Sequence, residues 1–173
     1  MPGSLNDILP EPISEENERI LLDLLKRKMK GASGMAVRLL HAMEERFGSQ
    51  AREVFRDMIG DCTPRPDAGA PQTDLEQFCA QLDRACVGSH EWERVIDEPD
   101  RIGYRFTRCM WAEVYRELGE PELGFVICAG DEPAVKSYNP ELGFKRTKVL
   151  MNGDPVCDHV YYVQRDESRE DGD

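Results

Sequence analysis

The sequence lacks the features of membrane, secreted and nucleic-acid-binding proteins. No apolar run approaches the ~20 residues that a membrane-spanning helix needs. The first seven residues show neither the basic region nor the apolar stretch of a signal peptide, so we expect a cytoplasmic location. Positive charge is scarce, because 22 Lys and Arg stand against 34 Asp and Glu, a formal net charge of −12. This acidity argues against electrostatically driven binding to nucleic acids and to anionic membranes.

Several common catalytic motifs are missing as well. The chain has no glycine-rich phosphate loop, no nucleophile-elbow serine and no His-Glu-x-x-His metal motif. Cysteine, in contrast, is present at positions 62, 79, 86, 109, 128 and 157. In a reducing compartment such cysteines are expected to be buried apolar residues, nucleophiles or metal ligands rather than disulfide partners.

The remaining composition fits one globular domain over residues 1–164. Its length suits a single domain with its own core. Residues 165–173 contain no apolar side chain and are expected to form a disordered acidic tail. Within the domain, residues 13–88 predict helices, and residues 91–164 predict strands mixed with short helices.

Helix signals follow one another through the first half. Ser14 and the acids after it predict a helix start, and apolar residues at helical spacing continue to Met29. Gly31 and Gly34 predict a break before a second helix that ends at Gly48. A third helix ending at Gly60 precedes a proline-rich loop over residues 63–71. A capping box at residues 73–76 then opens a helix with Cys79 and Cys86 on its apolar face.

The second half carries two hairpin signals. Residues 92–96 and 102–108 flank a turn at Pro99, and residues 144–151 and 156–163 flank Asn152-Gly153-Asp154. Short helices are expected between the two hairpins. The sequence therefore predicts an α+β fold, in which N-terminal helices pack on an antiparallel sheet of hairpins from the C-terminal half.

One close pair of residues suggests chemistry. Cys157 and His159 lie two apart on a predicted strand, so their side chains point to the same face. An imidazole beside a thiol can take its proton and give a reactive thiolate. The structural alternative is a half-buried cysteine beside a hydrogen-bonded histidine. Cys109, Cys128, Cys157 and His159 also have the ligand chemistry of a zinc or iron site, although only one close pair has suitable spacing.

Other residues of the same types are assigned to structure. Cys79 and Cys86 are expected to be small core residues. His41 and His90 stand alone among charged residues and are expected at the surface or in helix caps. Trp111 is expected to pack its helix rather than to contact a substrate.

A more specific signal comes from a set of blocks over residues 105–162. The first is the continuous run from Phe106 to Gly119. The others are Cys128, Asp131-Glu132, Tyr138-Asn139-Pro140, Arg146-Thr147, Leu150, Gly153-Asp154 and Cys157-Asp158-His159. In order and spacing these blocks resemble the C-terminal half of the L-2-amino-thiazoline-4-carboxylic acid hydrolase family. Met110 departs from the pattern, because many relatives have a proline there.

The resemblance implies a hydrolase that opens a cyclic isothiourea or amidine-type small molecule at its C–S bond. In the namesake reaction, water converts 2-amino-thiazoline-4-carboxylate into N-carbamoyl-cysteine. A thiolate could add to the electrophilic C2 and leave an isothiouronium adduct for water to resolve, or a base could activate water directly. Either route needs an acid for the departing sulfur, a carboxylate for the amidine-like group and a cation for the substrate carboxylate.

These needs translate into expected roles. Cys157 is the first-choice nucleophile with His159 as its base, and Cys109 is the second choice. Asp131 or Glu113 would pair with the amidine-like group, and Arg108 or Arg146 would bind the carboxylate. Cys128 and Asn139 complete the expected substrate-binding set, and no cofactor is expected. The alternative is a non-catalytic domain that binds a small molecule or a metal through Cys109, Cys128, Cys157 and His159. The sequence does not indicate the oligomeric state.

Overall fold

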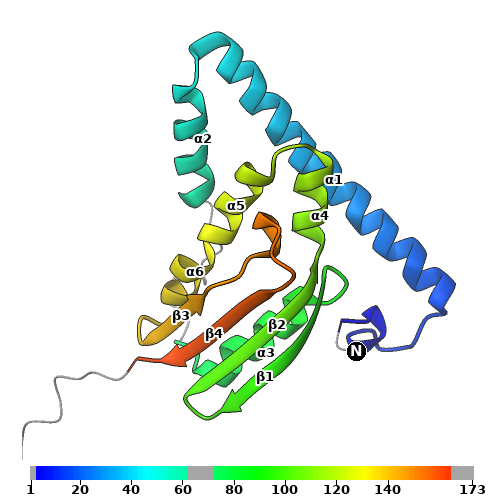
Figure 1. Ribbon diagram of the computed structural model, residues 1–173. Coiled ribbons are helices and arrows are strands. Elements are labelled where there is room, and N and C mark those ends of the chain that lie inside the picture. The colour runs from blue at the N-terminus through cyan, green and yellow to red at the C-terminus, as the bar shows by residue number, and fades with distance from the viewer. Residues whose placement is uncertain (1–2, 62–71, 165–173) are drawn as a thin grey trace, which may run out of the picture.

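The computed structural model describes residues 3–61 and 72–164 (Figure 1). The expected proline-rich loop and the acidic tail lie outside these residues, as does Cys62. The elements, in order, are η1 (Leu5–Asp7), α1 (Glu15–Phe47), α2 (Gln50–Asp61), α3 (Leu75–Cys86), β1 (His90–Glu98), β2 (Arg101–Cys109), α4 (Met110–Glu117), α5 (Pro121–Ala129), α6 (Asp131–Tyr138), β3 (Leu142–Arg146), η2 (Leu150–Asn152) and β4 (Cys157–Val163). No helix in the described ranges is long and apolar enough to cross a membrane.

The strands form one antiparallel sheet in the order β1-β2-β4-β3. Figure 1 shows α3 lying across one face of this sheet, with α4 and α5 gathered at one end. The long α1 runs diagonally past that end, and α2 returns beside α5. The described part of the first half is helical, and the strands lie in the second half with α4, α5 and α6 between β2 and β3, so the predicted α+β class is confirmed.

Local signals placed several elements correctly. Ser14 caps α1 through its side chain, which accepts a hydrogen bond from the N–H of Asn17. The capping box that begins α3 lies one residue later than the predicted box at residues 73–76, because Asp74 and Gln77 make the reciprocal hydrogen bonds. The first predicted hairpin is present as β1 and β2.

The predicted break at Gly31 and Gly34 is wrong, because α1 continues through both glycines to Phe47. A glycine inside a helix costs about 1 kcal/mol relative to alanine, which a well-packed helix tolerates. Gly34 lies on the buried face of α1, where a Cβ would stand 3.5 Å from the Leu118 side chain. Burial of Val37 and Leu40 on that face stabilises the continuous helix.

The second predicted hairpin is correct in its pairing and wrong in its bounds. β3 and β4 pair antiparallel, but β3 ends at Arg146 rather than Met151. The chain then forms the short η2 helix, which Gly153 ends with a left-handed φ of 95°. The side chain of Asp158 fixes the chain where it leaves the sheet after β3, because its carboxylate accepts hydrogen bonds from the N–H groups of Thr147 and Lys148.

Candidate functional site

The candidate site is a small pocket of about 170 Å³ between the sheet, α3 and the helices at its end. Its polar or reactive lining residues are Cys86, His90, Cys109, Cys128, Asp131, Arg146, Cys157 and His159. Its apolar and aromatic walls are Leu82, Phe106, Trp111, Ile127 and Tyr161. The pocket thus brings together six of the nine residues that the sequence suggested for the site.

Strand register explains part of this convergence. Cys157 stands opposite Phe106 of β2, and His159 stands opposite Arg146 of β3. Cys109 reaches the same place because it ends β2 and directly precedes α4. Cys128 and Asp131 arrive at the junction of α5 and α6, which Gly130 joins in a helical conformation.

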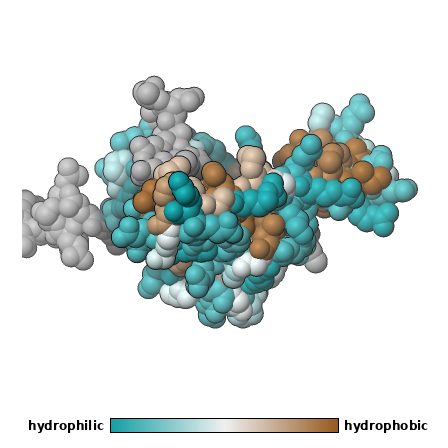
Figure 2. All heavy atoms as spheres, turned by 90° about the horizontal axis from the view of Figure 1, so that it is seen from above, coloured by the Kyte–Doolittle hydropathy of each residue, from teal (hydrophilic) through white to brown (hydrophobic). Residues whose placement is uncertain are grey.

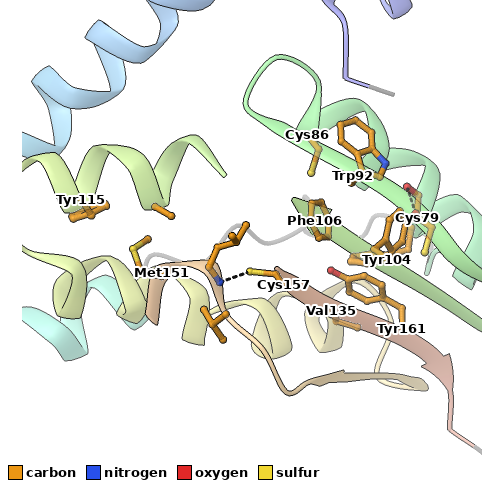
Figure 3. Close-up of a cluster of buried hydrophobic side chains, with 14 of the residues drawn as sticks. Cys79, Cys86, Trp92, Tyr104, Phe106, Tyr115, Val135, Met151, Cys157 and Tyr161 are labelled. Carbon is orange, nitrogen blue, oxygen red and sulfur yellow. Dashed lines mark hydrogen bonds between the residues drawn. The ribbon is translucent and has the colours of Figure 1, made fainter. Parts of the chain in front are cut away.

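Cys157 is buried on β4, and its sulfur accepts a hydrogen bond from the backbone N–H of Leu150 at 3.0 Å (Figure 3). Burial raises the pKa of this thiol, while the Leu150 N–H and the charge of Arg146 act in the opposite direction. The hydrogen bond ties the predicted nucleophile to η2 rather than to His159.

His159 points into the same pocket but stays neutral. Its Nδ1 lies 3.0 Å from the hydroxyl oxygen of Tyr161, and its ring centroid lies 4.8 Å from that of Phe106. Burial, aided by the charge of Arg146, lowers the pKa of His159 to about 3. This environment disfavours a resting pair of thiolate and imidazolium.

The other two candidate cysteines are protonated in the same way. Burial raises the pKa of Cys109 to about 11, although backbone N–H groups at the start of α4 oppose the rise. Burial raises the pKa of Cys128 to about 12. The pocket therefore holds thiols rather than thiolates, and their ionisation needs an added positive charge or a proton acceptor.

The principal charged group of the pocket is the ion pair of Arg146 and Asp131. The Arg146 side chain is only 10% exposed, and its second terminal nitrogen donates to the Cys128 carbonyl at 3.0 Å. Burial raises the pKa of Asp131 to about 6 in spite of the nearby guanidinium. Asp131 is thus the pocket group that exchanges a proton closest to neutral pH.

Three predicted binding residues lie elsewhere. Arg108 and Glu113 form an ion pair with a nitrogen–oxygen distance of 2.6 Å, and neither lines the pocket. Lys26 of α1 joins them, 2.9 Å from Glu113. Asn139 donates to the Thr73 carbonyl and accepts from the N–H of Glu141, so it fixes the chain before β3. These contacts give all three a structural role.

Sequence reasoning missed three pocket residues. His90 was expected at the surface, but its ring lies in the pocket wall beside Phe106, and burial lowers its pKa to about 4. Cys86 is a core residue as expected and lines the pocket as well. Trp111 also reaches the pocket, although it was expected only to pack its helix. No local pattern marks these positions, since their roles arise from packing between distant elements.

The metal alternative depends on how closely its four ligand side chains approach one another. Cys109, Cys128, Cys157 and His159 all line the pocket. Within residues 3–61 and 72–164, however, no three His, Cys, Asp or Glu side chains stand close enough together to hold a metal ion.

The position of Cys157 in the pocket depends on η2, which donates the Leu150 N–H to its sulfur. Met151 of η2 packs against α5 at Gly124, where a Cβ would lie 2.6 Å from the methionine sulfur and 2.8 Å from Tyr115 Cβ. Glycine at position 124 therefore permits the close approach that places the Leu150 N–H beside Cys157.

Comparison with known proteins agrees with these features. None of the proteins with curated descriptions matches the chain. A family model described as L-2-amino-thiazoline-4-carboxylic acid hydrolase matches residues 27–161, which include every pocket residue and most of α1. The match extends beyond the blocks at residues 105–162 and covers most of the chain. The protein belongs to the L-2-amino-thiazoline-4-carboxylic acid hydrolase family.

Proposed function

We propose that this protein hydrolyses a small cyclic isothiourea of the 2-amino-thiazoline-4-carboxylate type, opening the ring at its C–S bond. The observation that carries the proposal is the presence of Arg146, Asp131 and three candidate thiols around one small pocket. The family's name supports the same reaction class.

The size of the pocket supports a small substrate. Pockets for drug-sized ligands measure roughly 300–1,000 Å³. At about 170 Å³, this pocket suits a single substituted ring, enclosed by Phe106, Trp111 and Tyr161.

The charges of the pocket support a substrate with both signs. The carboxylate of such a ring would pair with the Arg146 guanidinium, whose planar donors match a carboxylate. The amidine-like group would face Asp131. A zwitterion would therefore replace the contact between Arg146 and Asp131 with two contacts of its own.

The raised thiol pKa values support activation by the substrate itself. A positively charged ring beside Cys157 would lower the pKa of the thiol, and Asp131, with a pKa of about 6, would accept the proton. Asp131, rather than His159, is the proposed acid–base group, because the low pKa of His159 makes its ring a weak base.

The proposed steps balance with one water molecule. The Cys157 sulfur adds to C2, the C2–S ring bond breaks, and the ring sulfur takes the proton from Asp131. Water then adds to the isothiouronium carbon and passes a proton to Asp131. The bond to Cys157 breaks, and Asp131 returns its proton to the Cys157 sulfur. The hydroxyl proton of the resulting protonated urea passes to solvent, which balances the proton that the cationic ring brought in, and N-carbamoyl-cysteine leaves with a free thiol. These steps use no metal, so chelation is expected to leave turnover unchanged.

Substitution of the nucleophile tests the proposal. We expect Cys157→Ser to lower turnover of 2-amino-thiazoline-4-carboxylate by at least about 100-fold, because a hydroxyl is a far weaker nucleophile. Turnover is measured as thiol release with a thiol-reactive dye and as a gain of one water by mass spectrometry.

The matched control is Cys79→Ala, a buried cysteine of α3 that does not line the pocket. It should keep the activity of the unmodified protein. Full activity in Cys157→Ser together with loss in Cys109→Ser would transfer the nucleophile to Cys109. No turnover by the unmodified protein would reject the substrate class.

A further inference from the structure

We propose that His90 recognises the exocyclic amino group of the substrate, by accepting a hydrogen bond at a bare Nε2 whose orientation Ser89 fixes. The inference rests on the proposed function, because it assigns a role toward the same cyclic isothiourea. His90 begins β1 and lines the pocket, but none of the reaction steps above uses it.

Hydrogen bonds at the end of α3 determine which ring nitrogen of His90 carries the proton. The Ser89 hydroxyl donates its one proton to the Cys86 carbonyl, over 3.2 Å. The same oxygen lies 2.9 Å from His90 Nδ1 and, with its proton already used, can only accept there. Nδ1 therefore carries the ring proton, and Nε2 keeps a free lone pair. Ser89 is thus a positioning residue that acts through His90.

The Nε2 atom of His90 is open to the pocket. Within residues 3–61 and 72–164, no group makes a hydrogen bond to this nitrogen, and the protein does not enclose it fully. The ring stands edge-on to Phe106, with its centroid 5.7 Å away, in the aromatic wall of the pocket. A ligand in the pocket therefore meets an acceptor that no described group of the protein uses.

The His90 ring is neutral, as an acceptor for a cationic group must be. Burial lowers the pKa of His90 to about 4, and the charge of Arg108 acts in the same direction. A protonated ring would repel a positively charged ligand and would have no free lone pair. At neutral pH, His90 thus offers an acceptor without adding positive charge to the pocket.

The pocket also shields this acceptor from water. On the outer surface, exposed apolar side chains gather on α1, at the end of the molecule away from the sheet, as Figure 2 shows. The pocket instead holds its polar atoms between the side chains of Phe106, Trp111 and Tyr161. In such an enclosed site an acceptor without a donor is costly, so a ligand that brings the matching N–H is favoured.

The sheet separates His90 from the expected carboxylate site. Arg146 lies on β3 and His90 on β1, and the strand order β1-β2-β4-β3 places three strand spacings between them, roughly 14 Å across the sheet. Both side chains nevertheless line the one pocket. A substrate carboxylate bound at Arg146 would therefore direct the other end of the molecule toward His90.

The proposed substrate carries more N–H donors than Asp131 can accept. A protonated 2-amino-thiazoline has one ring N–H and two N–H bonds on its exocyclic nitrogen. The two oxygens of the Asp131 carboxylate match the ring N–H and the exocyclic N–H beside it. The second exocyclic N–H lies on the sulfur side of C2, away from the carboxylate on C4. This is the donor that remains for His90 Nε2.

Nuclear magnetic resonance tests the tautomer without any turnover. The protein is Cys157→Ser, labelled at its histidine nitrogens, since this variant slows ring opening under the proposed function. Correlations from the carbon-bound ring protons distinguish the protonated nitrogen from the bare one, and His90→Gln identifies the His90 signals. We expect one Nδ1–H tautomer, and a shift of the Nε2 signal when 2-amino-thiazoline-4-carboxylate is added. An Nε2–H tautomer overturns the proposal.

Two substitutions in the Cys157→Ser background separate recognition from packing. His90→Phe keeps an aromatic ring beside Phe106 but removes the acceptor, so the dissociation constant for 2-amino-thiazoline-4-carboxylate should rise at least about tenfold. His90→Gln keeps an acceptor oxygen at a similar reach and should stay within about threefold. His41→Gln, at a histidine of α1 that does not line the pocket, should bind unchanged. Calorimetric titration measures all three.

The outcomes distinguish this role from the proposed function. A loss in His90→Gln as large as that in His90→Phe, or larger, would show that the ring serves packing and overturns the proposal. Unchanged binding in His90→Phe overturns it as well, and both results leave the proposed function intact. No binding by the unmodified protein or by Cys157→Ser would reject the proposed function, and this role with it.

Discussion

Two pairs of arginine and carboxylate in this protein have opposite electrostatic outcomes. Arg146 and Asp131 lie in the pocket, and Arg108 and Glu113 lie between α4 and the end of β2. Burial raises the pKa of Asp131 to about 6 despite its arginine. Burial acts in the same direction on Glu113, but hydrogen bonds from Arg108 and Lys26 hold the pKa of that carboxyl below its usual value.

The comparison shows that an arginine neighbour does not by itself determine how a carboxylate behaves. Glu113 has two cations, so it stays ionised and joins α1, β2 and α4. Asp131 has one cation, and although its side chain is 36% exposed, the desolvation by the pocket walls outweighs that cation, so it can hold a proton near neutral pH. A position for acid–base chemistry therefore depends on a deficit of cations around a partly buried acid.

The largest expected effect is the contrast between the two arginines. Arg146→Gln should lower kcat/KM by at least about 100-fold, because it removes the cation expected to bind the substrate carboxylate. Arg108→Gln should change kcat/KM by less than about 2-fold, because Arg108 does not line the pocket. Steady-state kinetics of ring opening measures both. Equal losses in the two variants would contradict the assignment of the carboxylate site to Arg146.

The pH dependence of turnover comes next. Because ionised Asp131 is the proposed acceptor of the thiol proton, kcat/KM should rise about tenfold per pH unit below pH 6 and level off above it. Asp131→Asn should remove this inflection along with most of the activity. Glu113→Gln should keep the inflection, since Glu113 is not in the pocket. A pH profile unchanged in Asp131→Asn would reject the acid–base role.

The two carboxylates should also affect stability with opposite sign. Asp131 has a raised pKa, so its stabilising contribution is complete below about pH 4 and is lost as pH rises through 6. Glu113 has a lowered pKa, so its contribution is present above about pH 4.5 and is lost as pH falls. From pH 4 to pH 7, the free energy of unfolding of Asp131→Asn should rise by about 1 kcal/mol relative to that of the original protein. This figure is smaller than the pKa shift alone would give, because the Asp131 side chain is partly exposed. Urea unfolding at both pH values measures it, and an equal gain in Glu113→Gln would contradict the contrast.

The smallest expected effect concerns the ion pairs that Lys26 makes with Glu113 and Glu117. Lys26→Ala removes ion pairs to Glu113 and Glu117 whose side chains are about a third exposed. Such pairs contribute roughly 0.5 kcal/mol each at most, so the free energy of unfolding should fall by less than about 1 kcal/mol. Chemical denaturation at low and high salt measures this loss, which should shrink at high salt. A larger loss that ignores salt would show that Lys26 acts through packing.

Elements with strong local signals were predictable from the sequence. Ser14 located the start of α1, the predicted box at residues 73–76 located the start of α3 to within one residue, and alternation around Pro99 located the first hairpin. The helix break predicted at Gly31 is absent because a single glycine weakens a helix without ending it when the neighbouring turns pack well. The end of β3 at Arg146 depends on the Asp158 carboxylate, which lies across the sheet and cannot be read from local pattern.

The site was predictable where it follows strand periodicity or a family block. Alternation put Cys157 and His159 on one face, and the blocks named Asp131 and Arg146. The choice between Arg108 and Arg146 needed the fold, because it depends on which arginine faces the pocket. His90 could not be found from the sequence, since its burial arises from packing against Phe106.

The contact of Met151 with Gly124 has a consequence for comparing members of this family. It sets the position of η2, and η2 supplies the N–H that solvates the Cys157 sulfur. A larger residue at position 124 would shift that donor and change the acidity of the thiol while leaving every pocket side chain the same. Under the proposed role of Cys157 as nucleophile, two relatives with identical pocket residues would therefore differ in rate, and positions 124 and 151 belong in any sequence signature used to assign their activity.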